Sequence, residues 1–119
     1  MSDRHHMSPA SDSHLRMPDS ALLAEAADVF AMLADATRLR LLWLLAQEES
    51  DVGSLAERCE VSRTAVSQHL AKLRLAGLVK TRREGRHVFY SLHDGHLRRL
   101  VLEALGHADH RTSGRAPRG

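Results

Sequence analysis

Four side chains near the end of the chain have the types and the spacing of metal ligands. Asp94 and His96 stand at the start of a predicted helix, and His107 and His110 stand near its end. Imidazole nitrogens and carboxylate oxygens are common ligands of Zn²⁺, at about 2.0–2.2 Å from the ion. An apolar stripe at helical spacing separates the two pairs, so residues 94–110 are expected to form one amphipathic helix.

Helix geometry keeps the two pairs apart within one chain. His96 and His107 are 11 positions apart, so they share a face but are separated by about 16 Å along the axis. Two copies packed antiparallel would bring the start of one helix beside the end of the other. A twofold axis then creates two equivalent sites, each built from the first pair of one chain and the second pair of its partner. The spacing therefore suggests a homodimer whose interface is also a metal site.

A simpler interpretation of the same residues stays open. Helix ends rich in His and Asp are common on protein surfaces, and nine His in 119 residues produce some pairs by chance. His5 and His6, near the N-terminus, are candidate additional ligands, but adjacent His in a polar segment are often incidental.

The composition is that of one small, mainly helical domain. With 43% hydrophobic residues and few aromatics, the core must consist mostly of Leu, Ala and Val, which favours helices. No apolar run approaches 18 residues and no signal-peptide core is evident, so a cytoplasmic protein without membrane association is expected. The single Cys59 excludes an internal disulfide and a cysteine-rich metal site within one chain.

Charge is distributed unevenly along the chain. The net charge is only +2, but Arg and Lys concentrate in residues 63–86 while acidic residues gather in 19–60. This asymmetry favours contact between one basic face and a polyanion.

Polar segments flank the predicted domain. Residues 1–18 form a predicted flexible N-terminal arm, and residues 111–119 form a predicted flexible basic tail. The domain between them covers residues 19–110. Its expected helices run from Asp19 or Ser20 to Leu33, from Asp35 to Gln47, from Asp51 to Cys59, from Ser62 to Gly77, and from Asp94 to His110.

The third and fourth of these helices, joined by a tight turn, have the helix-turn-helix pattern. Two alternating strands follow, Leu78–Arg82 and Arg86–Leu92, with a turn at residues 83–85 in which Gly85 supplies a positive φ. A hairpin directly after a recognition helix is the wing of a winged helix. Its arginines are expected to hold phosphates: Arg82, Arg83 and Arg86.

The outer face of the recognition helix carries side chains suited to DNA. Arg can donate a bidentate pair to guanine, and Gln can pair with adenine. Ser and Thr at a helix start can bond phosphates or base edges. His69 could contribute, but it is equally compatible with facing the neighbouring helices. The candidates on this helix are Arg63, Thr64, Ser67, Gln68, His69 and Lys72.

These motifs resemble the ArsR/SmtB family of bacterial metal-sensing repressors over about residues 20–110. The Asp-x-His and His-x-x-His pairs look like the zinc-type site of this family. The resemblance implies a mainly α winged helix-turn-helix fold with a small β-hairpin, dimeric through its N- and C-terminal helices. The matching stretches are LADATRLRLL at 33–42, VSRTAVSQHL at 61–70, LRLAGLV at 73–79 and GRHVFY at 85–90.

The resemblance also implies a function. The metal-free dimer would bind double-stranded operator DNA, and Zn²⁺ as the effector would release it and derepress metal efflux or homeostasis genes. Ni²⁺ or Co²⁺ is the alternative metal, for which His5 and His6 could supply extra ligands. Some family members bind soft metals through a Cys-x-Cys pattern near the first helix of the DNA-binding pair. Residues 49–55 contain no Cys here, which makes that site unlikely in this chain.

Two other classes of protein remain to be distinguished. One is a winged-helix transcriptional regulator that senses no metal. The other is a His-rich metal-storing protein or metal-dependent enzyme. The sequence has no activated nucleophile and no Gly-rich phosphate loop, so a protein that is not an enzyme is expected.

Overall fold

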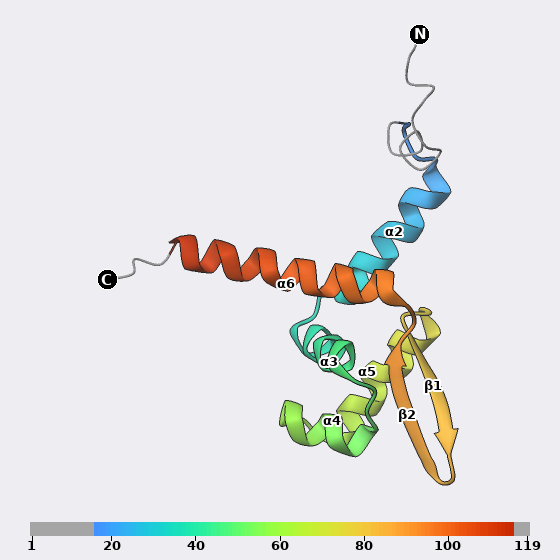
Figure 1. The fold of residues 1–119 in the computed structure, drawn as a ribbon. Helices are drawn as coiled ribbons and strands as arrows, with labels where there is room; N and C mark the ends of the chain where they lie inside the picture. Colours follow the sequence, from blue (N-terminus) through green and yellow to red (C-terminus); the bar gives the residue numbers. More distant parts are fainter. Residues whose placement is uncertain (1–15, 116–119) are drawn as a thin grey trace. The chain divides into compact units, whose positions relative to one another are not determined.

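The computed structural model describes residues 16–115 of the chain (Figure 1). His5, His6 and most of the predicted N-terminal arm lie outside this range. The chain divides into two compact units, residues 1–31 and 32–119. The elements are α2 (Ser20–Leu33), α3 (Ala36–Gln47), α4 (Val52–Cys59), α5 (Arg63–Leu75), β1 (Val79–Glu84), β2 (His87–Leu92) and α6 (Gly95–Arg115).

Each helix begins directly after a short polar side chain that accepts a hydrogen bond from a backbone N–H of the first turn. Such caps satisfy donors that have no partner inside the helix. The expected helices start at or next to all five of these residues, but a capping role for Asp94 is not among the expectations from the sequence. The bonds join Leu22 to Asp19 (2.8 Å), Arg38 to Asp35 (2.9 Å), Ser54 to Asp51 (2.8 Å), Ala65 to Ser62 (3.0 Å) and Leu97 to Asp94 (3.0 Å).

The core of the second unit is built from Leu and Val side chains of four helices, which confirms the expected winged helix with an aliphatic core. Leu75, the last residue of α5, is not part of this core and is 90% exposed. Residues two positions apart on a helix point in nearly opposite directions, so burial of Leu73 turns Leu75 outward. The fully buried side chains include Leu41, Leu42, Leu55, Val66, Leu70, Leu73 and Val101.

The hairpin lies where the sequence predicts it, but its turn is placed differently. Arg83 and Glu84 belong to β1 and pair with Val88 and His87. The strands therefore turn at only two residues, of which Gly85 has φ +63°. A two-residue hairpin turn requires positive φ, which Gly adopts without strain, so this glycine sets the turn position.

Helix α6 is longer than expected. It continues to Arg115, so the predicted tail at 111–119 begins inside the helix. No proline interrupts residues 95–115, and the Thr112 hydroxyl donates a hydrogen bond to the Ala108 carbonyl within the helix. The first half of α6 packs on the domain through Leu97 and Val101, whereas the second half extends past α3 (Figure 1).

One side chain fixes the start of α6 to the end of α3. The Arg98 Nε donates to the Ala46 carbonyl oxygen at 2.9 Å, and a cation suits the negative end of a helix dipole. Within residues 16–115, none of the helices combines the length and the apolar character needed to cross a membrane.

Several large apolar side chains of α2 are exposed. Leu33 is the buried residue of α2. Leu22, Leu23 and Phe30 are 59%, 50% and 59% exposed. Helical periodicity indicates which side chains share a face, but it does not tell whether that face is covered.

Candidate DNA-binding face and metal-ligand positions

The outer face of α5 presents most of the residues predicted to contact DNA. Val66, Leu70 and Leu73 bury the opposite face in the core and therefore fix the orientation of the helix. The side chains predicted to contact DNA are exposed at five of six positions: Arg63, Thr64, Ser67, Gln68 and Lys72.

His69 is the sixth position, and it is only half-buried. Its Nδ1 is buried and has no hydrogen-bond partner among the described residues. The ring lies near Asp35, where it adds to a lowering of the carboxyl pKa that is caused mainly by the N–H of Arg38. This side chain faces the neighbouring helices, so its predicted DNA contact has weaker geometric support than the other five.

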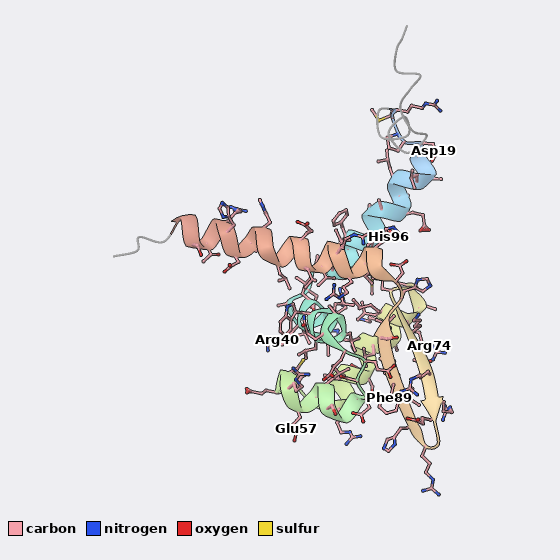
Figure 2. All side chains as sticks on the ribbon, in the orientation of Figure 1. Asp19, Arg40, Glu57, Arg74, Phe89 and His96 are labelled. Atoms are coloured by element: carbon pink, nitrogen blue, oxygen red, sulfur yellow. The ribbon has the colours of Figure 1, made fainter. Side chains whose placement is uncertain are left out.

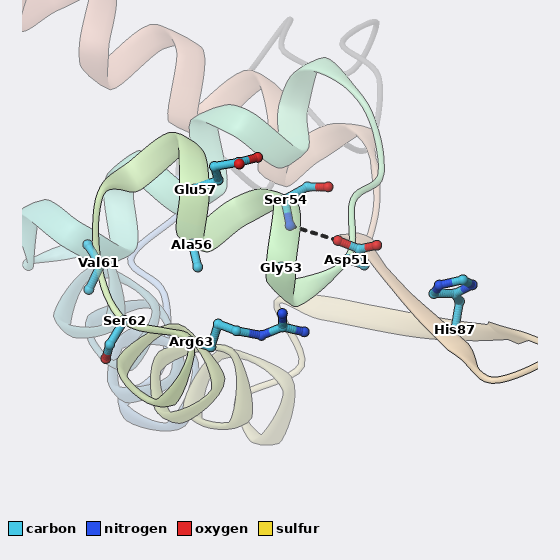
Figure 3. Close-up of a pocket in the computed structure, with 9 residues that line it drawn as sticks. All are labelled: Asp51, Gly53, Ser54, Ala56, Glu57, Val61, Ser62, Arg63 and His87. Carbon is cyan, nitrogen blue, oxygen red and sulfur yellow. Dashed lines mark hydrogen bonds between the residues drawn. The ribbon is translucent and has the colours of Figure 1, made fainter.

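Arg63 does not extend freely into solvent. Its guanidinium lies against Gly53 of α4, where an added Cβ would be 3.3 Å from Nη1. Figure 3 shows it in a polar hollow between the two helices of the motif, with Ser62 nearby and His87 at the hairpin side. Asp51 also lines this hollow, and the cation contributes in part to its lowered pKa, which is due mainly to the Ser54 N–H. The exposed guanidinium of Arg63 therefore contacts α4 as well as solvent.

The three hairpin arginines have different surroundings. Arg82 is ion-paired with Glu49 and lies 3.6 Å from Glu84. Arg83 and Arg86 are exposed and make no ion pair with any residue in the described part of the chain. Two of the three predicted phosphate contacts therefore have side chains available for DNA.

Asp94 has a structural role that the sequence analysis does not assign to it. Its Oδ1 accepts the N–H of Leu97 at 3.0 Å, and its Oδ2 lies 3.4 Å from the Nδ1 of His93. The Leu97 hydrogen bond, with a smaller contribution from His93, holds the pKa of this carboxyl below its usual value. The ionised carboxylate has lone pairs left on both oxygens for a ligand. An Asp before a helical pattern is an N-cap signature that identifies this role.

The three His ligand candidates lie along α6 and are all exposed: His96, His107 and His110. Figure 2 labels His96 in the first turn of the helix. The helix is continuous from Gly95 to Arg115, so the first and second pairs stay about 16 Å apart. Within residues 16–115, no three His, Cys, Asp or Glu side chains of one chain come together as a metal site.

Cys59, the last residue of α4, belongs neither to the outer face of α5 nor to the ligand positions of α6. It is 2% exposed, and burial raises the pKa of its thiol. A buried, protonated thiol packs as a small apolar side chain.

Comparison with known proteins identifies the helix-turn-helix region. Residues 35–81 match the family described as "Bacterial regulatory protein, arsR family". The chain is 53% identical over 83 residues to the HTH-type transcriptional regulator KmtR of Mycobacterium tuberculosis, covering 70% of this chain and 64% of KmtR. It is 48% identical over 81 residues to the transcriptional repressor SmtB homolog of Synechocystis sp., covering 68% of this chain and 61% of that protein.

A solved structure extends the likeness beyond the matched motif. The homodimeric winged helix-turn-helix DNA-binding domain Mb0332 from Mycobacterium bovis, a possible ArsR-family regulator, superposes with a TM-score of 0.75. Its sequence is 32% identical, and the alignment covers 88% of this chain and 99% of that domain.

The chain spans less than two thirds of the length of the KmtR and SmtB-homolog relatives, whereas it covers nearly all of the Mb0332 domain. The family and these relatives are regulatory proteins, so the expectation that the chain is not an enzyme is confirmed. The matched motif, the shared winged helix and the sequence identity together show that the chain belongs to the ArsR family of bacterial regulatory proteins.

Proposed function

We propose that this chain is a metal-responsive transcriptional repressor that works as a homodimer. In this proposal the metal-free dimer binds operator DNA, and a metal ion bound between the two α6 helices releases it. The observation that carries the proposal is the combination of an exposed polar face on α5 with two ligand pairs that one α6 cannot unite.

Support for DNA binding comes from the exposed side chains of α5 and the hairpin. Gln68 and Lys72 are exposed one helical turn apart, so both can face the same groove. Arg83 and Arg86 lie near the hairpin turn, where cations can neutralise phosphates. A two-fold dimer would place two such faces about one DNA turn apart.

Support for dimerisation comes from apolar side chains that a single chain leaves exposed. Leu22, Leu23 and Phe30 lie on α2, and Trp43 of α3 is 40% exposed. A small domain gains stability by burying such groups against another copy. The Mb0332 domain with the same fold is homodimeric. The two N-terminal and the two C-terminal helices are the proposed interface.

Support for a metal site comes from the chemistry of the donors. Asp94 and His96 of one copy, with His107 and His110 of the other, provide one carboxylate and three imidazoles. Such a four-ligand set suits tetrahedral Zn²⁺. Bound there, the ion would link the two α6 helices. Ni²⁺ or Co²⁺ remains the alternative, with His5 and His6 as candidate additional ligands.

Release of DNA requires the metal-holding conformation to bind DNA less well than the metal-free one. Arg98 and the buried Leu97 and Val101 attach α6 to the domain that contains α5. Ligand pairs drawn together across the interface would fix the relative position of the two α6 helices. The spacing of the two α5 helices would change with it, and two half-sites on one duplex tolerate little change in spacing.

The test begins with a duplex selected from a random pool by the metal-free protein. Titration with Zn²⁺, Ni²⁺ and Co²⁺ separately, monitored by fluorescence anisotropy and by Co²⁺ and Ni²⁺ absorption spectra, should show DNA release by at least one metal. Asp94→Asn should abolish release, because Asn keeps the helix cap but removes the carboxylate ligand.

Asp109→Asn is the matched control, since Asp109 is an exposed carboxylate between the two His of the second pair. It should respond to metal like the unaltered protein. Tight DNA binding with no metal bound would leave a winged-helix regulator that senses no metal. Failure to select any duplex would overturn the DNA-binding proposal itself.

A further inference from the structure

The loop between α3 and α4 is attached to both strands of the hairpin. Ser50 and Tyr90 exchange two backbone hydrogen bonds, of 3.1 Å and 2.8 Å, which join the loop to β2. Ser50 is 7% exposed, so the junction is buried. The neighbouring Glu49 reaches β1, where it binds Arg82.

The contact between Glu49 and Arg82 is bidentate. The Arg82 Nε lies 3.0 Å from Oε1 and 3.1 Å from Oε2, and its Nη2 also donates to Oε1. The guanidinium carbon lies 4.8 Å from the centre of the Phe89 ring, which Figure 2 labels on the hairpin. The hydrogen bonds from Arg82 lower the pKa of the Glu49 carboxyl, and this carboxyl raises the pKa of Arg82. Planar bidentate pairs fix orientation as well as distance.

The two attachments lie at adjacent rungs of the hairpin. Thr81 pairs with Tyr90, and Arg82 pairs with Phe89. Only two further rungs and the turn lie beyond them, so the tip projects by about 7–10 Å at about 3.3 Å per residue. Arg83 and Arg86 belong to this projecting tip.

We propose that Glu49 is a positioning residue for DNA binding: with Arg82 it sets the angle of the hairpin, so that Arg83 and Arg86 reach the phosphate backbone. Arg82 then acts inside the fold and is not itself a phosphate contact. This inference rests on the proposed DNA-binding function and assigns Arg82 a different role from the one expected from the sequence.

A positioning role for Glu49 predicts a change in DNA affinity opposite to the change expected from charge alone. If Arg82 bound a phosphate, Glu49 would compete with DNA for it. Neutralising Glu49 would then strengthen DNA binding. If Glu49 positions the hairpin, its neutralisation should weaken binding even though the protein becomes less negative.

The experiment compares Glu49→Gln with Glu48→Gln on the duplex selected by the unaltered protein. Glu48 belongs to the same loop but is 70% exposed and lies 4.0 Å from Arg58, so its variant has the same charge change without touching the hairpin. Kd is measured by fluorescence anisotropy at several salt concentrations. Glu49→Gln should weaken binding by about two- to fivefold per hairpin, the size expected for an exposed ion pair, while Glu48→Gln should not weaken it.

The salt dependence separates a positioning role from a general loss of folded protein. A smaller folded fraction weakens binding without altering the slope of log Kd against log salt. If the hairpin arginines no longer reach the DNA, that slope should fall by about one for each phosphate that they cease to neutralise. Arg82→Gln should match Glu49→Gln, and the double variant should be no weaker than either, because the two side chains act as one unit.

Three outcomes would overturn the inference. These are tighter binding by Glu49→Gln, an unchanged salt slope in that variant, or a further loss of affinity when Arg82→Gln is added to it. Failure of the unaltered protein to bind any duplex would instead refute the proposed function, so the two failures are distinguishable. Thermal unfolding of each variant verifies that the compared proteins are folded.

Discussion

In the helix-turn-helix region, the side chains proposed to contact DNA lie on one face of α5 and on the adjoining hairpin of the same chain. Along α6, the four proposed metal ligands lie in two groups that the helix itself holds apart. The first region is therefore assembled by folding alone, whereas the second needs another copy. Variants in the two regions should accordingly separate DNA affinity from metal response.

The largest effect is expected from His107→Ala. Each proposed site loses one of four ligands, so metal affinity should fall by more than about 100-fold, since even the loss of outer-shell partners costs about 10–100-fold. DNA binding without metal should stay unchanged, because His107 is exposed in the second half of α6 and does not belong to the proposed DNA-binding face. Metal titration of the DNA-bound protein measures the metal affinity, and fluorescence anisotropy without metal measures the DNA affinity. Loss of DNA binding by the metal-free variant would show that the two regions do not act separately.

A second variant addresses the DNA-binding face. Gln68→Ala should weaken binding to the selected duplex by about 1–3 kcal/mol, the value of one good base contact. Binding to random-sequence DNA should be unaffected. Gln47→Ala, at an exposed Gln on α3, is the control. Equal losses on both duplexes would assign Gln68 to a phosphate contact.

A smaller effect is expected for the cap of α6. Asp94→Ala should lower the free energy of unfolding by about 1 kcal/mol, the usual cost of losing an N-cap, while Asp94→Asn should change it by much less. Both variants should lose metal-induced release. Urea unfolding of the two variants measures the difference, with Asp109→Ala as a control away from any cap. Equal stability of the Ala and Asn variants would show that the Leu97 hydrogen bond contributes little.

The smallest effect is expected from acid. Asp35, Asp51 and Asp94 each accept a backbone hydrogen bond that lowers the carboxyl pKa below its ordinary value of 3.8. Their contribution to stability is therefore complete above pH 3.8 and is lost as pH falls through the lower folded-state values. Unfolding midpoints measured from pH 6 to pH 3 should decline near the acid end. An unfolding midpoint that rises as the pH falls towards 3 would contradict this prediction.

Much of the fold was predictable because its signals are local. Asp35, Asp51 and Ser62 are short polar residues in front of apolar periodicity, and each caps the predicted helix. Gly85 indicates a turn nearby, and the sequence predicts it at residues 83–85. In the structure Arg83 and Glu84 still pair within the hairpin, so the turn lies at residues 85–86. The DNA-facing side of α5 was predictable for the same reason, since its opposite face is apolar.

The contact between Glu49 and Arg82 could not be predicted because it joins distant parts of the chain. Glu49 and Arg82 are 33 positions apart, and nothing in their local sequence indicates that they pair. The cap formed by Asp94 is a local interaction, but the same residue also fits a ligand pattern, so the sequence leaves its role ambiguous. Exposure of Phe30 was not foreseeable either, because helical periodicity does not show which chain covers an apolar face. The domain boundaries, the metal and the cytoplasmic location stay predictions.

The unbroken α6 has a genetic consequence. Since one copy contributes only half of each proposed site, two different defective alleles should complement each other. A mixed dimer of an Asp94→Asn subunit with a His107→Ala subunit combines both lesions in one of its two sites. The other site keeps all four intact ligands. Co-expression of two unresponsive alleles should therefore restore part of the induction that neither allele supports alone.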